Sequence, residues 1–308
     1  MKSQKNIFLL QSNLTCVFAA LSFAMGFPAL DVLLNDWGII SVVLVRNSIA
    51  FIFISLLWLI SEDFDNLVKA KWLKGSLIGA IGFGIGSLLL VITQVLTTAF
   101  IAALAAALMP IAAITLEIIF DNRNITIRFF TGLALVLLGS MIILGINELD
   151  LKFSVGLFIG LMSVTFFAWG SRASVRHLPK MTTLARTSTT TFGMCGFCLI
   201  TYLISLYFKI EASHVPKINL EHVKLFVIYS CFGLAISQIL WIQGVQKLGI
   251  GIASLHLNIT PFYVMFILFI TGYEWNWTQA IGALIILIGI SITQINYKNF
   301  RSINFKNP

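Results

Sequence analysis

The chain has 308 residues, of which 58% are hydrophobic and 10% are charged. Soluble globular domains carry about 25% charged residues, so this composition excludes a water-soluble fold and predicts a surface that faces lipid. The formal net charge of +8 does not indicate a nucleic-acid partner, because the basic residues lie between apolar stretches and do not gather along one face.

Ten apolar stretches of about 20 residues, the length that crosses a hydrocarbon core, follow one another along the chain. We therefore predict an all-α integral membrane protein with ten transmembrane helices. The first stretch follows the basic residues Lys2 and Lys5, but it is too long for the apolar part of a signal peptide and is expected to stay in the protein. The predicted helices cover residues 14–34, 39–60, 73–92, 97–119, 128–146, 154–175, 183–207, 223–243, 251–271 and 278–296.

Lysine and arginine are distributed unevenly between the two sides of this predicted bundle. Of the 20 such residues, fifteen lie on the side that holds both termini, four lie on the opposite side, and Arg46 lies within a helix. Loops rich in lysine and arginine stay on the cytoplasmic side of a membrane. The sequence thus predicts a multi-pass protein of the cell (inner) membrane with both termini in the cytoplasm.

The two halves of the chain can be laid over each other. At an offset of 140 residues Arg46 falls on Arg186, and at an offset of 151 residues Pro110 falls on Pro261. The offset increases by eleven residues, which places an insertion in the segment 209–224. The paired arginine and paired proline favour an ancestral duplication, because chance matches are far more common among leucine, isoleucine and glycine.

Such a duplication gives two inverted five-helix repeats, which we place at 11–146 and 151–296. Because five is an odd number, the second repeat lies upside down in the membrane relative to the first. Inverted repeats are typical of alternating-access transporters, in which the halves exchange conformations and expose a site between them to one side and then to the other.

Several segments are similar to one known group of membrane proteins. They are Val45-Arg46-Asn47, the Ala-rich run 99–107 followed by Met109-Pro110, its counterpart 251–261, and Trp241 near the end of the eighth predicted helix. On these segments the chain resembles the drug/metabolite transporter superfamily, and specifically its EamA-type ten-helix permeases. The resemblance implies solute transport without naming the cargo, and it implies that the fifth and tenth helices are peripheral. Leu268 stands where the acidic residue matching Glu117 would be expected, so the two halves differ there.

Two ionisable residues stand out inside the predicted helices, where an unpaired charge costs at least about 2.5 kcal/mol. Arg46 lies well inside the second helix, and Asp31 lies near the end of the first. Arg46 could form a structural ion pair with Asp31, or its guanidinium could bind a carboxylate or phosphate of the cargo. Asp31 could instead be an interfacial carboxylate, a proton-coupled switch or the partner of a substrate amine.

Neutral polar and aromatic residues in mid-helix form a second group, because unsatisfied polar groups are costly in lipid and so tend to face other helices or a wet cavity. His256 could titrate near neutral pH and couple transport to protons, or it could be a neutral histidine hydrogen-bonded between helices. Trp169 could belong to an aromatic wall for the cargo or pack against lipid. The candidates for substrate binding or coupling are Arg46, Asp31, Gln94, Gln238, Trp241, His256, Asn258 and Trp169.

Proline and glycine mark places where helices bend or meet. Pro28, Pro110 and Pro261 interrupt the backbone hydrogen bonds and are hinge candidates, although simple kinks also occur in membrane helices. Gly82 and Gly86 form a GxxxG spacing, which allows another helix to approach closely.

Together these features predict a secondary transporter that moves a small polar or amphipathic metabolite across the cytoplasmic membrane by alternating access. The alternatives are a passive channel and a non-transporting membrane sensor on the same fold. The sequence carries no recognisable catalytic motif, so we expect no enzyme activity, no metal and no cofactor. The expected partners are the lipid bilayer, a small-molecule solute and either a coupling proton or an exchanged solute, with a homodimer left open.

Overall fold

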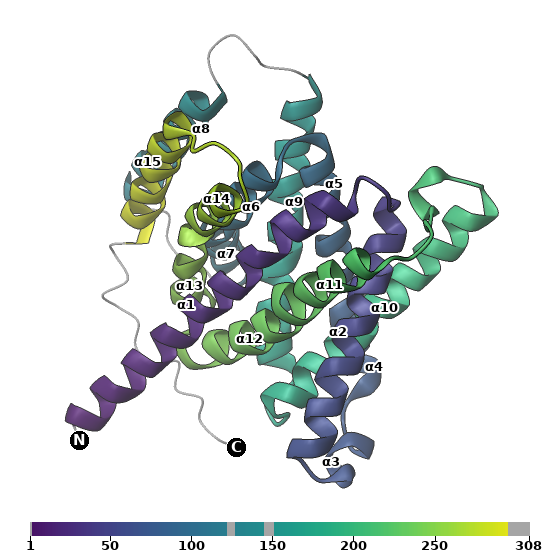
Figure 1. The fold of residues 1–308 in the computed structure, drawn as a ribbon. Helices are drawn as coiled ribbons and strands as arrows, with labels where there is room; N and C mark the ends of the chain where they lie inside the picture. Colours follow the sequence, from purple (N-terminus) through teal and green to yellow (C-terminus); the bar gives the residue numbers. More distant parts are fainter. Residues whose placement is uncertain (1, 122–126, 145–150, 295–308) are drawn as a thin grey trace.

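The computed structural model describes residues 2–121, 127–144 and 151–294, and within these ranges every regular element is a helix (Figure 1). The helices are α1 (Lys2–Leu33), α2 (Ile39–Ser61), α3 (Phe64–Val68), α4 (Trp72–Ile78), η1 (Gly79–Ile85), α5 (Gly86–Leu96), α6 (Ala99–Ala107), α7 (Met109–Asp121), α8 (Ile127–Leu144), α9 (Leu151–His177), α10 (Thr183–Tyr207), η2 (Glu211–Ser213), α11 (Leu220–Val227), η3 (Ile228–Ile236), α12 (Ser237–Leu248), α13 (Ile250–Leu255), η4 (His256–Ile259), α14 (Thr260–Ile270) and α15 (Trp277–Gln294).

In the described part of the chain, eight helical stretches are long and apolar enough to cross a membrane. They are α1, α2, α4–η1–α5, α6–α7, α9, α10, α11–η3–α12 and α13–η4–α14. The shorter apolar helices α8 and α15 complete the series. These ten helices follow the predicted order, so the predicted fold class is confirmed. We number the spans one to ten along the chain.

The described connections between the spans alternate between the two ends of the bundle. We name these the Gly38 end, which holds the turn 34–38 and the segment 208–219, and the Lys71 end, which holds α3 and the turn 178–182. At the Lys71 end Gly249 alone joins the eighth and ninth spans, with a φ of +78° that glycine adopts without steric cost. The eighth and ninth spans therefore form a tight helical hairpin.

The two repeats pack against each other in an internally symmetric way. The first span, α1, lies along η3 and α12 of the eighth, and the sixth span, α9, lies along η1 and α5 of the third. In the same way α2 pairs with its counterpart α10, and α8 pairs with its counterpart α15. Such reciprocal contacts are expected of two inverted repeats of five helices.

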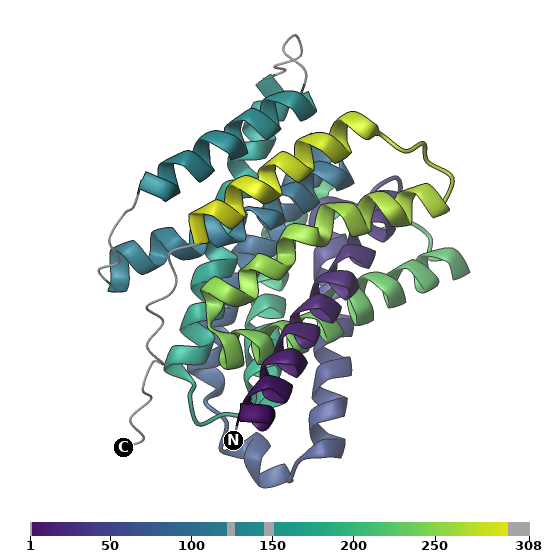
Figure 2. The same ribbon diagram turned by 90° about the vertical axis from the view of Figure 1, so that its left-hand side faces the viewer.

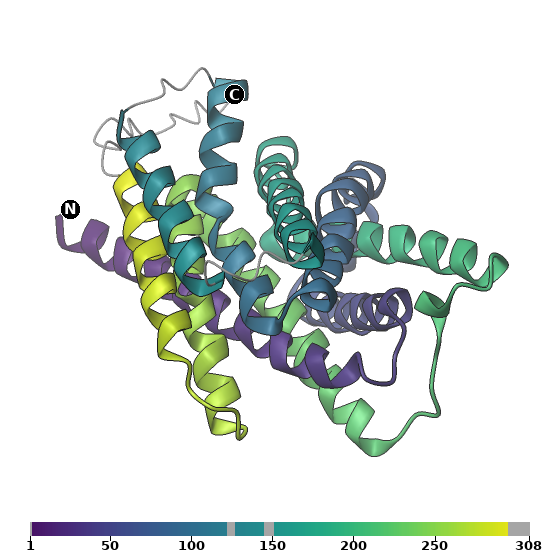
Figure 3. The same cartoon turned by 90° about the horizontal axis from the view of Figure 1, so that it is seen from above.

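The fifth and tenth spans form an edge of the bundle. Figure 1 shows α8 and α15 side by side, Figure 2 shows the pair from its own side, and Figure 3 shows the same arrangement from above. Glycines allow the close contact, because a Cβ on Gly289 would lie 2.7 Å from the carbonyl oxygen of Gly132. The two spans are peripheral, as the resemblance implied.

Both repeats carry a π-helical segment at the same place. The segment η1 interrupts the third span and η3 interrupts the eighth, and an offset of 151 residues lays η1 over the last seven residues of η3. A π-helix accommodates an extra residue within a helix and is frequent at functional sites. Matching π-helices indicate that this distortion belongs to the ancestral five-helix unit.

Glycines bring each π-helical segment against a span of the other repeat. A Cβ on Gly82 would lie 2.4 Å from the Cα atom of Gly170, and a Cβ on Gly233 would lie 2.9 Å from the Cα atom of Gly26. The close approach predicted from the GxxxG spacing at Gly82 is thus confirmed. Because Gly233 is the counterpart of Gly82, the counterpart of Gly26 is Gly170, 144 residues further along.

This offset corrects one alignment drawn from the sequence. The helices α2 and α10 begin at Ile39 and Thr183, which are also 144 residues apart. Arg46 and Arg186 are 140 residues apart and so lie about one helical turn from equivalence. The prediction that these two arginines are counterparts is wrong, because a match shifted by one turn keeps the same helix face and cannot be told from the true register by pattern alone. The later spans are offset by 151 residues, so the offset increases by seven residues and not by the eleven predicted.

The fourth and ninth spans are interrupted at matching positions. The fourth breaks before α7 begins at Met109, and the ninth passes through the 3-10 turn η4 before α14 begins at Thr260, 151 residues later. Each break precedes a proline, Pro110 or Pro261, which has no N–H for a helical hydrogen bond. Pro28, in contrast, lies inside the continuous helix α1.

Candidate functional site

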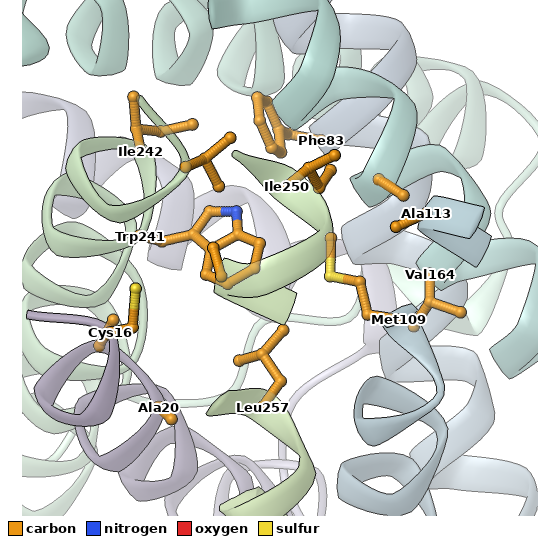
Figure 4. Close-up of a cluster of buried hydrophobic side chains, with 14 of the residues drawn as sticks. Cys16, Ala20, Phe83, Met109, Ala113, Val164, Trp241, Ile242, Ile250 and Leu257 are labelled. Atoms are coloured by element: carbon orange, nitrogen blue, oxygen red, sulfur yellow. The ribbon is translucent and has the colours of Figure 1, made fainter. Parts of the chain in front are cut away.

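A buried apolar cluster, the central cluster, fills the region where the two repeats meet (Figure 4). Trp241 of α12 lies there near Leu257 of η4 and Met109 of α7. Among the described residues the cluster takes side chains from spans one to four and six to nine, but from neither peripheral span. Its buried members are Cys16, Ala19, Ala20, Ala50, Ile54, Phe83, Met109, Ala112, Ala113, Leu116, Val164, Ala168, Met194, Leu234, Ala235, Trp241, Ile242, Val245, Leu248, Ile250, Ala253 and Leu257.

Trp241 is anchored to the sixth span through its indole nitrogen. Its Nε1–H donates to Oγ of Ser171 at 2.9 Å, and the Ser171 hydroxyl donates in turn to the carbonyl oxygen of Phe167 at 2.7 Å. Trp169 of the same span is half-buried and packs against the central cluster. Two predicted site residues, Trp241 and Trp169, are therefore both associated with the central cluster.

Two polar side chains next to the central cluster lack a hydrogen-bond partner. Gln238 lies one turn before Trp241 on α12, and Asn258 follows Leu257 in η4; each is 5% exposed. Within the described residues, nothing accepts from Nε2 of Gln238 or donates to Oδ1 of Asn258. Unpaired buried polar groups are costly, so these two atoms are available to a polar ligand. The half-buried His256 places Nδ1 3.3 Å from the carbonyl oxygen of Ala253.

Arg46 is buried, with 7% of its surface exposed, and is held by neutral groups. Its Nε and Nη2 both donate to Oδ1 of Asn47, at 3.0 and 2.9 Å, and its Nη1 donates to the hydroxyl of Tyr229 at 3.0 Å. The guanidinium carbon also lies 4.9 Å from the centroid of the Tyr229 ring, a cation–π distance. Arg46 thereby ties α2 of the first repeat to the π-helical segment η3 of the second.

Asp31 has a different partner. Gln94 of α5 donates from Nε2 to Oδ1 of Asp31 at 3.1 Å and to the carbonyl oxygen of Phe27 at 2.9 Å. The predicted ion pair between Asp31 and Arg46 is therefore wrong within the described structure, because Asp31 faces the third span whereas Arg46 faces the eighth. Asp31 and Gln94 both line a depression of about 540 Å³ at the Gly38 end.

The segment 208–219, which overlaps the region 209–224 where the insertion was predicted, lies against the turn between α1 and α2. The backbone N–H of Gly38 donates to the carbonyl oxygen of His214 at 3.0 Å, and Nε2 of His222 lies 2.9 Å from Oδ2 of Asp36. A Cβ on Gly38 would come within 2.4 Å of the carbonyl oxygen of Ala212, so a larger residue would push this segment away. The inserted segment thus joins the two repeats at the Gly38 end.

Sequence reasoning missed Tyr229, Ser171 and the contact between His222 and Asp36. Tyr229 lies in an apolar run between other aromatic and aliphatic residues, and nothing in its spacing separates it from the many lipid-facing aromatic side chains. Its hydroxyl was the one available signal, because a phenol placed deep in a membrane helix needs a hydrogen-bond partner. That partner, Arg46, lies on a span of the other repeat.

Comparison with known proteins now assigns the chain to a group. A profile described as "EamA-like transporter family" matches it twice, over residues 10–145 and 154–294. The chain belongs to the EamA-like transporter family. It is therefore a multi-pass membrane transporter, and the predicted resemblance to this group is confirmed.

Two further proteins are similar to this EamA-like transporter along most of its length. A Bacillus subtilis (strain 168) protein named "Uncharacterized transporter YrdR" is 23% identical over 299 residues, which make up 92% of this chain and 90% of the relative. A solved structure described only as "Crystal structure of protein" reaches a TM-score of 0.67 at 14% identity and covers 94% of this chain and 99% of its own. The second likeness shows the shared fold.

Within this EamA-like transporter the candidate residues occupy three separate places. Trp241 and Trp169 lie at the central cluster, with the unpaired side chains beside it. Asp31 and Gln94 lie together at the Gly38 end. Arg46 lies between α2 and η3, bonded within the protein. The predicted site residues thus lie in three places: at the central cluster, at the Gly38 end and at the contact between α2 and η3.

Proposed function

We propose that this EamA-like transporter is a secondary transporter that moves a small polar or amphipathic metabolite by alternating access. The observation that carries the proposal is the matched pair η1 and η3, each packed through glycines against a span of the other repeat. Two equivalent contacts in inverted repeats can exchange conformations, and opening at one end then mirrors closing at the other.

The cargo site that we propose lies beside the central cluster, between the breaks in the fourth and ninth spans. Gln238 and Asn258 offer there one N–H donor and one oxygen acceptor that the protein leaves unpaired. Trp241 and Trp169 offer apolar aromatic surface. Ligand sites commonly combine a largely apolar wall with a few placed polar groups, which suits a molecule with an apolar body and at least two polar atoms.

Pro110 and Pro261 are the proposed hinges, because each follows a helix break at the same position of its repeat. The absence of one backbone hydrogen bond at each proline lowers the cost of bending there. Energy for the cycle would come from a coupled proton, for which His256 is the candidate carrier, or from exchange with a second solute.

The first test is exchange in proteoliposomes loaded with a metabolite panel, read by mass spectrometry as trans-stimulated uptake. We expect saturable uptake of one class of solute. Gln238→Leu and Asn258→Leu should each raise the half-saturating concentration about fivefold, because a buried hydrogen bond contributes about 1 kcal/mol. Gln243→Leu is the matched control on α12, since Gln243 is half-buried and, unlike Gln238, has no buried unpaired polar atom among the described residues; its uptake should resemble wild type.

Each alternative gives a different result in the same assay. Flux that rises linearly with concentration and shows no trans-stimulation would identify a passive channel. A folded protein that moves no member of the panel would favour a non-transporting sensor. Equal loss of uptake in Gln243→Leu and in the two site variants would remove the argument for a site beside the central cluster.

The proposed orientation places the Lys71 end and both termini in the cytoplasm, because the basic loops gather on that side. The test starts from a chain whose four native cysteines have been replaced. A single new cysteine is then introduced either at Asn66 in α3 or at Lys217 in the segment 208–219, both of which are exposed. We expect a membrane-impermeant maleimide to label Lys217→Cys in intact cells and Asn66→Cys only after permeabilisation. The opposite labelling pattern would reverse the orientation.

A further inference from the structure

The depression of about 540 Å³ at the Gly38 end has an acidic lining. Asp31 and Glu211 line it from different repeats, and no lysine or arginine occurs among the described residues around it. The chain as a whole carries a net charge of +8, so the charge of this depression is opposite in sign to the net charge of the protein. Lys209 lines the neighbouring depression instead.

Two polar side chains on this depression are buried and incompletely bonded: Trp37, whose Nε1–H has no acceptor among the described residues, and Gln94. Gln94 is 3% exposed, and both N–H groups of its amide are used, one by Phe27 and one by Asp31. Its Oε1 accepts no hydrogen bond from any described residue. These two bonds fix the orientation of the amide, so Oε1 remains an acceptor without a donor.

The Asp31 carboxylate has spare acceptor capacity as well. A carboxylate offers about four acceptor positions, and the amide of Gln94 is the one donor recorded for Asp31 among the described residues. Asp31 is only half-buried, so its remaining positions can be reached from the depression. Asp31 and Gln94 together therefore offer one negative charge and several unfilled acceptors, but no free donor.

A protonated amine matches this set, since it brings one positive charge and up to three N–H donors. A metal ion matches it less well, because the described residues contain no group of three histidine, cysteine or acidic side chains that could hold one. Trp37 and Tyr273 also line the depression, and aromatic faces attract ammonium groups. The Asp31 carboxylate, the unfilled oxygen of Gln94 and the aromatic rings favour an ammonium group, whereas the unpaired Nε1–H of Trp37 would donate to an acceptor atom of the same ligand.

We propose that the Asp31–Gln94 pair is a second binding site, separate from the cargo site beside the central cluster, where the protonated amine of the cargo binds at the Gly38 end, so that this transporter carries amine-bearing metabolites. The inference rests on the proposed transport function for its physiological meaning. Binding of the amine is itself a property of the folded protein, and can be measured without transport.

The binding arm measures thermal unfolding of the detergent-solubilised full-length protein, because a ligand that binds only the folded state raises the unfolding midpoint. The probes are phenethylamine, putrescine and the amides of standard amino acids, each beside its N-acetylated form, which lacks the charge. Quaternary trimethylated forms keep the charge but have no N–H. We expect free amines to raise the midpoint, quaternary forms to do so less and N-acetyl forms not at all.

The transport arm uses the same probes in proteoliposomes, with Asp31→Asn, Asp31→Glu and the control Asp36→Asn. Asp36 lies at the same end but outside the 540 Å³ depression, and its carboxylate contacts His222. We expect Asp31→Asn to raise the apparent KM for amines about 10- to 100-fold, as expected for loss of a charge-assisted hydrogen bond. Asp31→Glu should recover part of the loss, and Asp36→Asn should resemble wild type.

The two arms separate failure of the inference from failure of the proposed function. Saturable transport confined to neutral or anionic solutes would contradict the proposed amine site but would still support the proposed transport function. Amines that stabilise wild type but not Asp31→Asn, with no transport of any probe, would uphold the amine site and count against the transport cycle. Equal stabilisation by free and N-acetylated amines would overturn the inference.

Discussion

Replacing Arg46 with alanine is expected to lower the free energy of unfolding by about 3 kcal/mol. The change leaves Oδ1 of Asn47 and the hydroxyl of Tyr229 without the guanidinium, and each buried group left unpaired costs about 1–3 kcal/mol. It also empties the space of a long side chain that is 7% exposed, which adds a cavity cost. Relief from burying the charge offsets part of the total.

Two further variants divide this effect. Arg46→Met keeps most of the volume but supplies no donor, so we expect it to cost about 1–2 kcal/mol. Tyr229→Phe removes a single hydroxyl and should cost about 1 kcal/mol. The measurement is the midpoint of thermal unfolding in detergent. An Arg46→Met protein more stable than wild type would contradict the structural role, and would show that burying the charge costs more than its bonds contribute.

Replacing Gly82 with valine is expected to abolish folding or to lower stability by more than about 3 kcal/mol. A Cβ at this position would lie 2.4 Å from the Cα atom of Gly170 and 3.0 Å from its nitrogen. Because both atoms belong to the backbone, the clash is relieved only if the two helices separate. Helices in a membrane associate through close packing of this kind rather than through a hydrophobic driving force. The expected readout is loss of the monodisperse peak in size-exclusion chromatography.

The repeats provide matched controls for this prediction. Gly233→Val should act like Gly82→Val, because a Cβ on Gly233 would meet the Cα atom of Gly26 at 2.9 Å. Gly196→Ala lies on α10 with nothing within 4 Å of the added Cβ, so it should be neutral or slightly stabilising. A stable, monodisperse Gly82→Val protein would mean that the third and sixth spans do not pack as described.

The sequence alone was sufficient for the architecture. Ten stretches of the length that spans a bilayer, few charges and a repeated pattern determined an all-helical membrane protein with two inverted halves. These properties depend on lipid as the solvent: a chain in hydrocarbon must satisfy its backbone hydrogen bonds locally, and helices do so. The segments resembling EamA-type permeases then indicated the family, which the match over both halves confirms.

Within the site, sequence reasoning chose relevant residues but could not pair them. Arg46 and Asp31 lie on spans that are consecutive in the sequence, so an ion pair was one expectation, but α1 packs along the eighth span and α2 packs along α10. Depth can be read from position along a helix, whereas the direction of a side chain depends on the rotation of that helix against its neighbours. The rotation of α1 turns Asp31 towards Gln94, and that of α2 turns Arg46 towards Tyr229.

What the sequence by itself determined about this protein is therefore which segments enter the membrane, where helices can bend, and that the two halves of the chain are repeats of each other. Only the tertiary structure decided that η1 and η3 pack against opposite repeats, that Trp241 bonds to Ser171, and that the inserted segment 208–219 reaches Gly38. The physical reason is that these contacts join residues 70 to 207 positions apart, and their register is set by side-chain packing between helices, which sequence periodicity does not encode.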